Sequence, residues 1–391
     1  TLYKSLVQAP RLAHQHRSRL QLPVWGSWSI SQGYQGPHTH LGRWANALDF
    51  VIRDDDGRTH RGDGSKLEDY YCYNKPVIAP LDGYVVALTN HVTENPVGGM
   101  DLDRNWGNSL VLHHLNGLYT QFSHLRQDSF QVVMGQWVHK GQVLAACGNS
   151  GRSPEPHLHF QVQSSPEIGA PTLAYPLAHY LAQKAPSVQG NPNQTDTAWE
   201  WKQWSVPLEG EEVRNLDPVE WLSNALAFKP GQTLRLQEEG KPEHILDWKV
   251  YTDAYNRTYL HCSQSQSTLW FVHDGVMFWA YDFESSRGSV LHAFYLSVYR
   301  LSLSAFEGEM EDRLPLMDFS RPLPRWIQDL LAPWWIFYNV RYGSRLRYSD
   351  PTGLVEGGIY SVSVRSLWGW KAVREARFQV HADAISGLNR F

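Results

Sequence analysis

The sequence predicts a mainly β protein with two domains built from antiparallel sheet. Three observations support this fold class. At 391 residues the chain is longer than a single ordinary core supports. Its first half consists of short apolar runs separated by turn dipeptides, and much of its second half alternates aromatic or aliphatic residues with polar ones. Apolar residues make up 42% of the chain and charged residues 19%, which excludes a disordered chain and one embedded throughout a membrane.

Composition divides the chain into four segments. Residues 1–24 begin with a polar stretch rich in Arg, His and Gln, and we expect an N-terminal arm there, either free or packed down as an extension. Residues 25–182 should form the first domain. Residues 183–199 are rich in Gln, Asn, Pro and Thr, which is typical of a linker. Residues 200–391 are expected to form an aromatic-rich β domain of unknown role, a meander that closes into a barrel or a sandwich.

The first domain has the sequence pattern of an antiparallel sheet. Asp82-Gly83 and Asn116-Gly117 adjoin apolar runs, and such dipeptides are the strongest short-range signals for a hairpin. The predicted strands of this domain cover residues 47–52, 76–88, 109–113, 118–122, 131–138 and 141–146.

The second domain is expected to contain one short helix, residues 325–331. This helix should end before Pro333, because proline cannot continue a helix. The predicted strands of the second domain cover residues 250–261, 268–283, 293–303, 335–349 and 359–380.

Charge and hydropathy narrow the class of partner. The formal net charge of −4 supplies no broad basic field for nucleic acid, so we expect no nucleic-acid partner. The longest strongly apolar stretch, residues 330–340, is about half of the roughly 20 residues that a spanning helix needs, and we expect no transmembrane segment within the chain.

The chain begins at Thr1 instead of Met. We therefore expect a processed product or a piece of a longer, membrane-anchored precursor.

The cysteines leave the compartment open. Only Cys72, Cys147 and Cys262 are present, so one disulfide, between Cys72 and Cys147, is one reading and three buried thiols are the other.

Four histidines and an aspartate form a candidate zinc site. Residues 157–160 read His-Leu-His-Phe, a pattern that is weak alone in a chain with 18 histidines. It gains weight from His40, Asp49 and the isolated His124 upstream. Zinc in a hydrolytic site takes three imidazole or carboxylate ligands and leaves a fourth position open, and His40, Asp49 and His159 can supply the three. His124 and His157 are then spare imidazoles for proton transfer and for stabilising an oxyanion.

The segments around these residues resemble the M23 family of zinc endopeptidases, the lysostaphin and LytM group that cuts peptide cross-links in bacterial cell walls. The matching segments are residues 40–50, 77–85, 119–125, 138–145, 148–151 and 156–160, in family order. The resemblance implies an antiparallel LytM-like peptidase domain over about residues 25–182. It also implies one Zn²⁺ ion bound by His40, Asp49 and His159. His124 and His157 would orient water, relay protons and stabilise the oxyanion.

Two features depart from the family pattern. Eight residues separate His40 from Asp49, whereas the common form of the motif has three. His38 lies two residues before His40 and is an alternative ligand. We prefer His40 because Gly42 and the run into Asp49 match the family better.

The expected function is a zinc metalloendopeptidase that hydrolyses peptide bonds in peptidoglycan stems or cross-bridges, in the periplasm or outside the cell. One alternative is a non-catalytic M23-like scaffold that binds and activates a separate cell-wall hydrolase. Another is the peptidase domain of a larger membrane-associated protein. Metal content distinguishes the enzyme from the scaffold, because such scaffolds usually lack zinc ligands.

Overall fold

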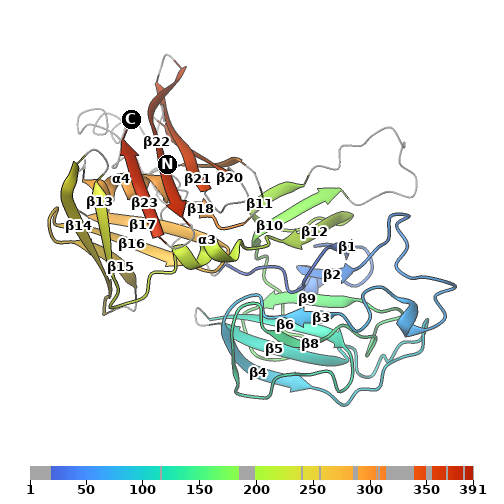
Figure 1. Ribbon diagram of the computed structural model, residues 1–391. Coiled ribbons are helices and arrows are strands. Elements are labelled where there is room, and N and C mark those ends of the chain that lie inside the picture. Colours follow the sequence, from blue (N-terminus) through green and yellow to red (C-terminus); the bar gives the residue numbers. More distant parts are fainter. Residues whose placement is uncertain are drawn as a thin grey trace, which may run out of the picture. The chain divides into compact units, whose positions relative to one another are not determined.

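A computed structural model gives the structure of the chain, which divides into two compact units, Ser18–Asn215 and a second unit that contains Leu216–Phe391 (Figure 1). The structure describes residues 19–114, 117–184, 199–238, 241–254, 257–284, 289–304, 306, 309–313, 339–348, 355–366, 369–381 and 384–390.

The first unit is built on one antiparallel ten-stranded sheet. Its strand order is β11-β10-β12-β1-β2-β9-β6-β5-β4-β7, and β3 and β8 form a separate two-stranded sheet. The elements are β1 (Trp28–Gln32), η1 (Gly42–Trp44), β2 (Ala47–Val51), η2 (Leu67–Asp69), β3 (Pro76–Ile78), β4 (Gly83–Thr89), β5 (Asn108–His114), β6 (Leu118–Leu125), β7 (Trp137–Val138), β8 (Val143–Ala146), β9 (Leu158–Gln163), β10 (Leu177–Lys184), β11 (Glu200–Ser205) and β12 (Glu211–Asn215). The mainly antiparallel β fold predicted from the sequence is confirmed.

The core of this unit includes part of the expected N-terminal arm. Leu20 and Leu22 have no exposed surface and pack in the same cluster as Phe50 and Phe122. The Leu22 backbone N–H donates to Asn215 Oδ1 at 3.0 Å. Of the two readings of residues 1–24, residues 19–24 are a packed extension and not a free arm, because Leu20, Leu22 and Val24 are buried in the core. Residues 1–18 lie outside the described residues.

The boundary between the units falls later than the sequence suggested. β11 pairs with β10, and β12 pairs with both β10 and β1. Residues 200–215 thus complete the sheet of the first unit, and the division follows Asn215. Most of the expected linker, residues 185–198, lies outside the described residues. The mixed polar and aromatic composition of β11 concealed its pairing, because edge strands of a sheet need no continuous apolar run.

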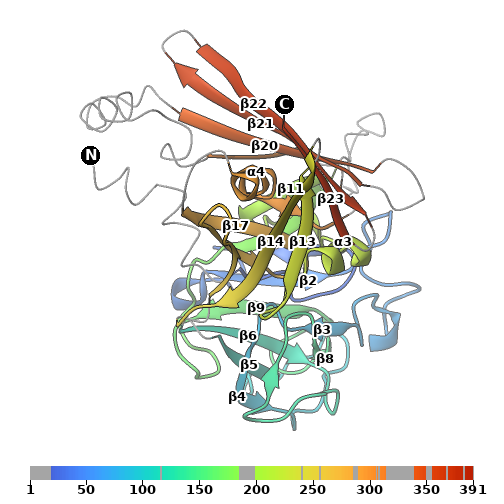
Figure 2. The same ribbon diagram turned by 60° about the vertical axis from the view of Figure 1, so that its left-hand side comes forward.

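The second unit contains a six-stranded antiparallel sheet in the order β13-β14-β15-β16-β17-β18. Helix α4 contacts β16 and β17, and Figure 2 shows it next to β17. The core there includes Trp248, Phe271 and Phe294. The elements are α3 (Glu220–Ala225), β13 (Thr233–Glu238), β14 (Lys241–Thr252), β15 (Thr258–Cys262), β16 (Ser267–His273), β17 (Met277–Glu284), α4 (Val290–Ser297) and β18 (Leu301–Ser302). A second β-rich region is confirmed.

The last part of the chain forms a five-stranded antiparallel sheet. Its strands are β19 (Glu309–Arg313), β20 (Asn339–Tyr348), β21 (Val355–Ser366), β22 (Gly369–His381) and β23 (Ala384–Arg390). The short helix expected at residues 325–331 lies outside the described residues.

The strand predicted over residues 293–303 is wrong for residues 293–297, which belong to helix α4, whereas residues 301–302 form β18. Ser289 caps this helix, and its Oγ accepts a hydrogen bond from the His292 backbone N–H at 3.1 Å. Leu291, Phe294 and Tyr295 are buried at helical spacing. The aromatic run therefore follows a helical period, which the β-rich context of the neighbouring segments concealed.

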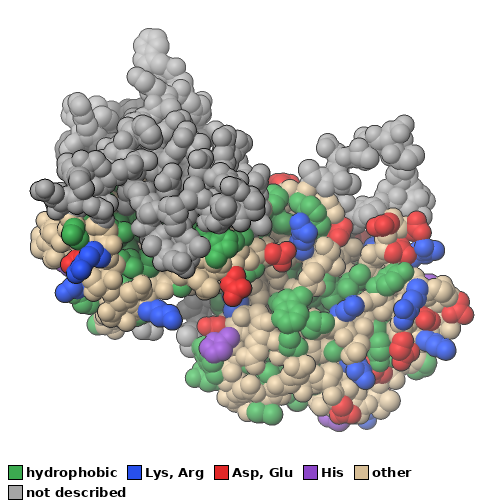
Figure 3. Space-filling model, viewed as in Figure 1, with side chains coloured by type: hydrophobic (Ala, Val, Ile, Leu, Met, Phe, Trp, Pro, Cys, Tyr) green, Lys and Arg blue, Asp and Glu red, His purple; other side chains and the backbone are tan. Residues whose placement is uncertain are grey.

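Charged side chains and helix hydropathy can be followed in the described residues. On the face seen in Figure 3, acidic and basic side chains of the described residues are interspersed instead of being gathered by sign. Within the described part of the chain, no helix has the length and apolar character needed to cross a membrane.

The three cysteines are free thiols in the structure. Cys72, Cys147 and Cys262 are all buried, which agrees with the second of the two readings of the sequence.

Candidate metal centre and catalytic residues

Asp49 and His159 face each other across two neighbouring strands. Asp49 lies in β2 and His159 in β9, and the two residues are direct antiparallel partners. Direct partners point to the same face of a sheet, with Cβ atoms about 4.5–5.5 Å apart. His159 Nδ1 accordingly lies 2.9 Å from Asp49 Oδ1. The strand register thus brings together two side chains that are 110 residues apart in the sequence.

His40 reaches the same point from the loop between β1 and β2. Its side chain is fully buried, and its Nδ1–H donates to the Gly33 carbonyl oxygen at 2.8 Å. In the neutral ring this leaves the Nε2 lone pair 3.2 Å from Asp49 Oδ1. The alignment of these two atoms is too poor for a hydrogen bond, and Nε2 has no hydrogen-bond partner among the described residues. A bound metal ion would satisfy such a buried nitrogen.

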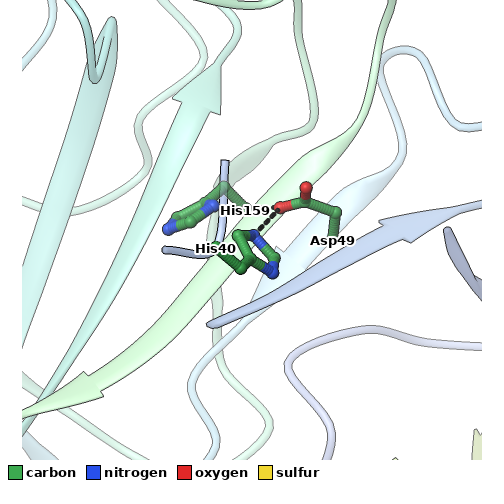
Figure 4. Close-up of side chains that lie close together, drawn as sticks. All are labelled: His40, Asp49 and His159. Atoms are coloured by element: carbon green, nitrogen blue, oxygen red, sulfur yellow. Dashed lines mark hydrogen bonds and ion pairs between the residues drawn. The ribbon is translucent and has the colours of Figure 1, made fainter. Parts of the chain in front are cut away.

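The three donor atoms form a compact set, shown in Figure 4. His40, Asp49 and His159 are buried, and each offers one ligand atom within 4.8 Å of the other two. Two imidazoles and a carboxylate are a donor set of hydrolytic zinc sites. The residues present therefore fit a zinc ion.

Asp49 is ionised, and its negative charge favours the binding of a cation. Burial alone would raise the pKa of this carboxyl group, but the adjacent imidazoles of His159 and His40 lower the pKa well below its ordinary value. The pKa of His40 is shifted in the opposite direction, upward. Burial lowers it, but the adjacent, negatively charged carboxylate of Asp49 outweighs burial, so the pKa lies above 6.5. The centre therefore holds an ionised carboxylate next to two imidazoles.

Two buried glutamines that were not predicted from the sequence contact the candidate ligands, at the polar atoms that face away from the common point. Gln32 Nε2 donates to Asp49 Oδ2 at 2.8 Å, and His159 Nε2–H donates to Gln161 Oε1 at 3.1 Å. One signal could have identified Gln161, which follows His159 by two residues and so shares its strand face. Gln32 carries no comparable signal, because its contact depends on the register between β1 and β2.

His124 lies next to His159 through an unusual backbone conformation. Ser123 on β6 is the direct partner of His159, so regular alternation would turn His124 to the opposite face of the sheet. His124 instead has a φ of 60°, a left-handed conformation that is strained for a residue other than glycine. Its ring centroid lies 5.9 Å from that of His159. The His124 ring therefore lies beside the candidate metal centre where the end of β6 departs from regular strand geometry.

His124 and His157 each have one ring nitrogen held by a backbone carbonyl. His124 Nδ1–H donates to the Ser150 oxygen at 2.8 Å, and His157 Nδ1–H donates to the Glu155 oxygen at 2.9 Å. Burial lowers the pKa of His124 well below its ordinary value, and the neighbouring imidazoles of His157 and His159 lower this pKa further. His124 is therefore neutral near pH 7, with its Nε2 lone pair available to accept a proton.

Two tryptophans lie beside the centre. The Trp106 ring centroid is 5.3 Å from that of His159 and 5.8 Å from that of Trp44. Trp44 Nε1–H donates to the Gly169 carbonyl oxygen at 2.8 Å. Gly169 has a φ of +80°, and a Cβ there would lie 2.2 Å from Trp106 Nε1, so the packing requires glycine. Neither tryptophan is fully buried.

The sequence analysis expected five residues at one site, and the structure places them close together: His40, Asp49, His124, His157 and His159. The alternative ligand His38 is exposed. Its backbone N–H donates to Gln32 Oε1 at 3.0 Å, and it lies outside the group of three convergent ligand atoms.

Residues 66–169 match peptidase family M23. The chain therefore carries an M23 peptidase domain. The matched segment contains His124, His157 and His159, whereas His40 and Asp49 precede it. The M23 resemblance seen in the sequence motifs is confirmed.

Part of the chain is also similar to curated proteins. The chain is 37% identical over 87 residues to the peptidoglycan DD-endopeptidase ShyB of Vibrio cholerae, a match that covers 22% of this chain and 17% of that protein. It is 25% identical over 169 residues to lysostaphin of Staphylococcus simulans, covering 39% of this chain and 33% of that one. The chain thus spans a third or less of the length of these relatives.

Among solved structures, a zinc-containing peptidase from Vibrio cholerae matches with 26% identity and a TM-score of 0.26. The match covers 40% of this chain and 41% of that one.

Proposed function

We propose that this protein is a zinc-dependent metalloendopeptidase that hydrolyses peptide bonds in the stems or cross-bridges of peptidoglycan. The observation that supports this most is the arrangement of His40, Asp49 and His159. One donor atom of each residue points to a common place, and the other polar atom of each side chain is hydrogen-bonded elsewhere. Side chains held in this way keep the geometry that a metal ion needs.

The chemistry is divided between the metal and two imidazoles. Zinc supplies Lewis acidity, which polarises a carbonyl group and makes water acidic near neutral pH. His124, neutral because it is buried, accepts a proton from the attacking water at Nε2. His157 is less buried than His124, and it stabilises the developing oxyanion and exchanges protons with solvent. The water oxygen adds to the scissile carbonyl carbon, the C–N bond breaks, and the proton passes to the departing amine.

The substrate class follows from the relatives by analogy. ShyB is named as a peptidoglycan DD-endopeptidase, and this chain is 37% identical to it over 87 residues. We place the protein in the periplasm or outside the cell, where peptidoglycan is accessible. Trp106 and Trp44 would form one side of the binding site, against which a peptidoglycan peptide packs.

Hydrolysis of isolated peptidoglycan tests the proposal, with mass spectrometry of the released fragments to identify the bond that is cut. We expect zinc-loaded protein to release peptides, a chelator to abolish release, and added zinc to restore it. His159→Ala should be inactive. His113→Ala is the matched control, because His113 stacks on Tyr119 and should leave activity intact. Undiminished hydrolysis by chelated protein would contradict the proposal. A folded, metal-free protein that stimulates a separate hydrolase would favour a scaffold instead.

A further inference from the structure

Gln32 connects two of the three candidate ligands. Its Oε1 accepts hydrogen bonds from the backbone N–H groups of His38 at 3.0 Å and Thr39 at 3.1 Å, immediately before His40. Its Nε2 donates to Asp49 Oδ2 at 2.8 Å and to Thr39 Oγ1 at 2.7 Å. One buried amide therefore supports the loop that carries His40 and also orients the carboxylate of Asp49.

Gln161 connects the third ligand to a different part of the chain. Its Oε1 accepts from His159 Nε2–H at 3.1 Å. Its Nε2 donates to the Ala170 carbonyl oxygen at 3.0 Å and to Gln163 Oε1, 2.6 Å away. Gln163 Nε2 in turn donates to the Glu167 carbonyl oxygen at 2.8 Å. A row of buried amides thus links His159 to the loop between β9 and β10.

Backbone groups determine how both amides are oriented. A backbone carbonyl can only accept a hydrogen bond and a backbone N–H can only donate one. The Ala170 carbonyl therefore requires the nitrogen of Gln161, which leaves the Gln161 oxygen facing His159 Nε2. The His38 and Thr39 N–H groups require the oxygen of Gln32, which leaves its nitrogen facing Asp49. Consequently His159 carries a proton on Nε2, and Asp49 Oδ2 is occupied by a donor.

From this arrangement we propose that Gln32 and Gln161 are positioning residues, which direct Asp49 Oδ1 and His159 Nδ1 toward the common point where a divalent cation binds. The inference rests on the metal site proposed above and concerns how that site reaches its affinity. It goes beyond the identity of the ligands, because neither glutamine contributes a ligand atom.

The burial of the two amides supports this role. Gln32 is 6% exposed and Gln161 1% exposed. A buried amide is unfavourable unless its donors and acceptor are all hydrogen-bonded, and an apolar side chain of similar size would fill the same space at lower cost. Each of these two amides is hydrogen-bonded at both its oxygen and its nitrogen. In each case one bond goes to a candidate ligand.

The test compares three variants of similar volume: Gln32→Met, Gln161→Met and the control Gln121→Met. Gln121 is also fully buried on the same sheet face, but its amide bonds to Gly169 and Ser123 instead of a ligand. Zinc affinity is measured without substrate, by competition with a chromophoric chelator, and folding by circular dichroism. We expect the Gln32 and Gln161 variants to bind zinc about 10- to 100-fold more weakly. The control should bind zinc with wild-type affinity.

Two further measurements separate positioning from general packing. Gln161→Glu keeps an acceptor oxygen for His159 Nε2–H but lacks the donor that the Ala170 carbonyl needs, so it should restore part of the affinity lost in Gln161→Met. NMR of histidine-labelled, zinc-loaded wild-type protein should show the His159 proton on Nε2 and none on Nδ1, a result that does not require any variant to fold. Wild-type affinity in folded Gln32→Met and Gln161→Met, or a His159 proton on Nδ1, would overturn the inference. Loss of affinity in a protein that cleaves no peptidoglycan would uphold it and reject only the proposed substrate.

Discussion

The imidazole rings of His124 and His157 lie 4.7 Å apart, centroid to centroid, and each ring has its Nδ1 facing a backbone carbonyl oxygen. Neither ring belongs to the three-residue ligand group. The arrangement keeps one ring nitrogen of each residue for structure and leaves the other for chemistry.

His124→Ala should reduce kcat by about 10²- to 10⁴-fold, the usual contribution of a positioned acid or base. Zinc affinity should change little, because His124 supplies no ligand atom. Turnover of a defined wall peptide and chelator competition measure the two effects separately. A His124→Ala protein that retains full kcat would remove His124 from the mechanism.

Zinc should stabilise the folded protein. A ligand that binds only the native state adds about 2.7 kcal/mol when its free concentration is about 100-fold above Kd. Thermal unfolding of the metal-free protein, with and without added zinc, should therefore show a higher Tm with zinc. The same titration of His159→Ala provides the control, and an equal rise in Tm there would place the bound zinc elsewhere.

Gly169→Ala should destabilise the protein and displace Trp106. A left-handed backbone costs alanine about 1–2 kcal/mol, and the clash with the Trp106 indole adds about 1–3 kcal/mol. Gly210→Ala is a close control, because Gly210 has a φ of +79° with nothing within 4 Å of the added Cβ. Urea unfolding and tryptophan fluorescence measure the difference. Equal losses in the free energy of unfolding of the two variants would show that Trp106 moves aside without destabilising the protein.

Stability should fall between neutral and acid pH partly because of His114. This fully buried residue donates from Nδ1 to the Asp82 carbonyl oxygen and accepts at Nε2 from the Thr120 hydroxyl. Burial lowers the pKa of His114 from 6.5 to about 4. Because the folded pKa is the lower one, the contribution is complete above about pH 6.5 and is lost as the pH falls toward 4, a change of about 3 kcal/mol.

Urea unfolding at pH 7 and pH 4.5 measures this dependence. His114→Gln, which does not titrate, should be less stable at pH 7 but should lose less stability on acidification. A variant with the wild-type pH dependence would show that other groups account for the slope.

Leu22→Ala should lower the free energy of unfolding by about 2–5 kcal/mol, because Leu22 is fully buried and the substitution leaves a cavity. Leu208→Ala, at a leucine that is 62% exposed, should change it by no more than about 0.5 kcal/mol. Chemical denaturation compares the two variants. A small effect at Leu22 would mean that the segment is a loosely attached arm after all.

The candidate site was predictable from the sequence, and its supporting contacts were only partly so. The His-Leu-His-Phe segment, His40, Asp49 and His124 stand in recognisable motifs, because each side chain has a chemistry that few positions require. Gln32 carries no such signal. Its contact with Asp49 depends on which residues pair between β1 and β2, and a shift of one residue would turn its side chain to the opposite face.

The sequence alone determined the antiparallel β class, the M23 motifs and the residue types of a candidate zinc site, because local patterns of turns, alternation and chemistry lie in contiguous residues. The tertiary structure decided where the first unit ends, that residues 290–297 are helical, and how the candidate ligands are oriented. Those features depend on pairing between distant segments. β12 pairs with β1, from which it is separated by most of the sequence of the first unit. The Ala170 carbonyl orients Gln161, and Gln161 in turn orients His159. Local sequence does not specify such partners, because the free energy that selects them arises only when the strands assemble.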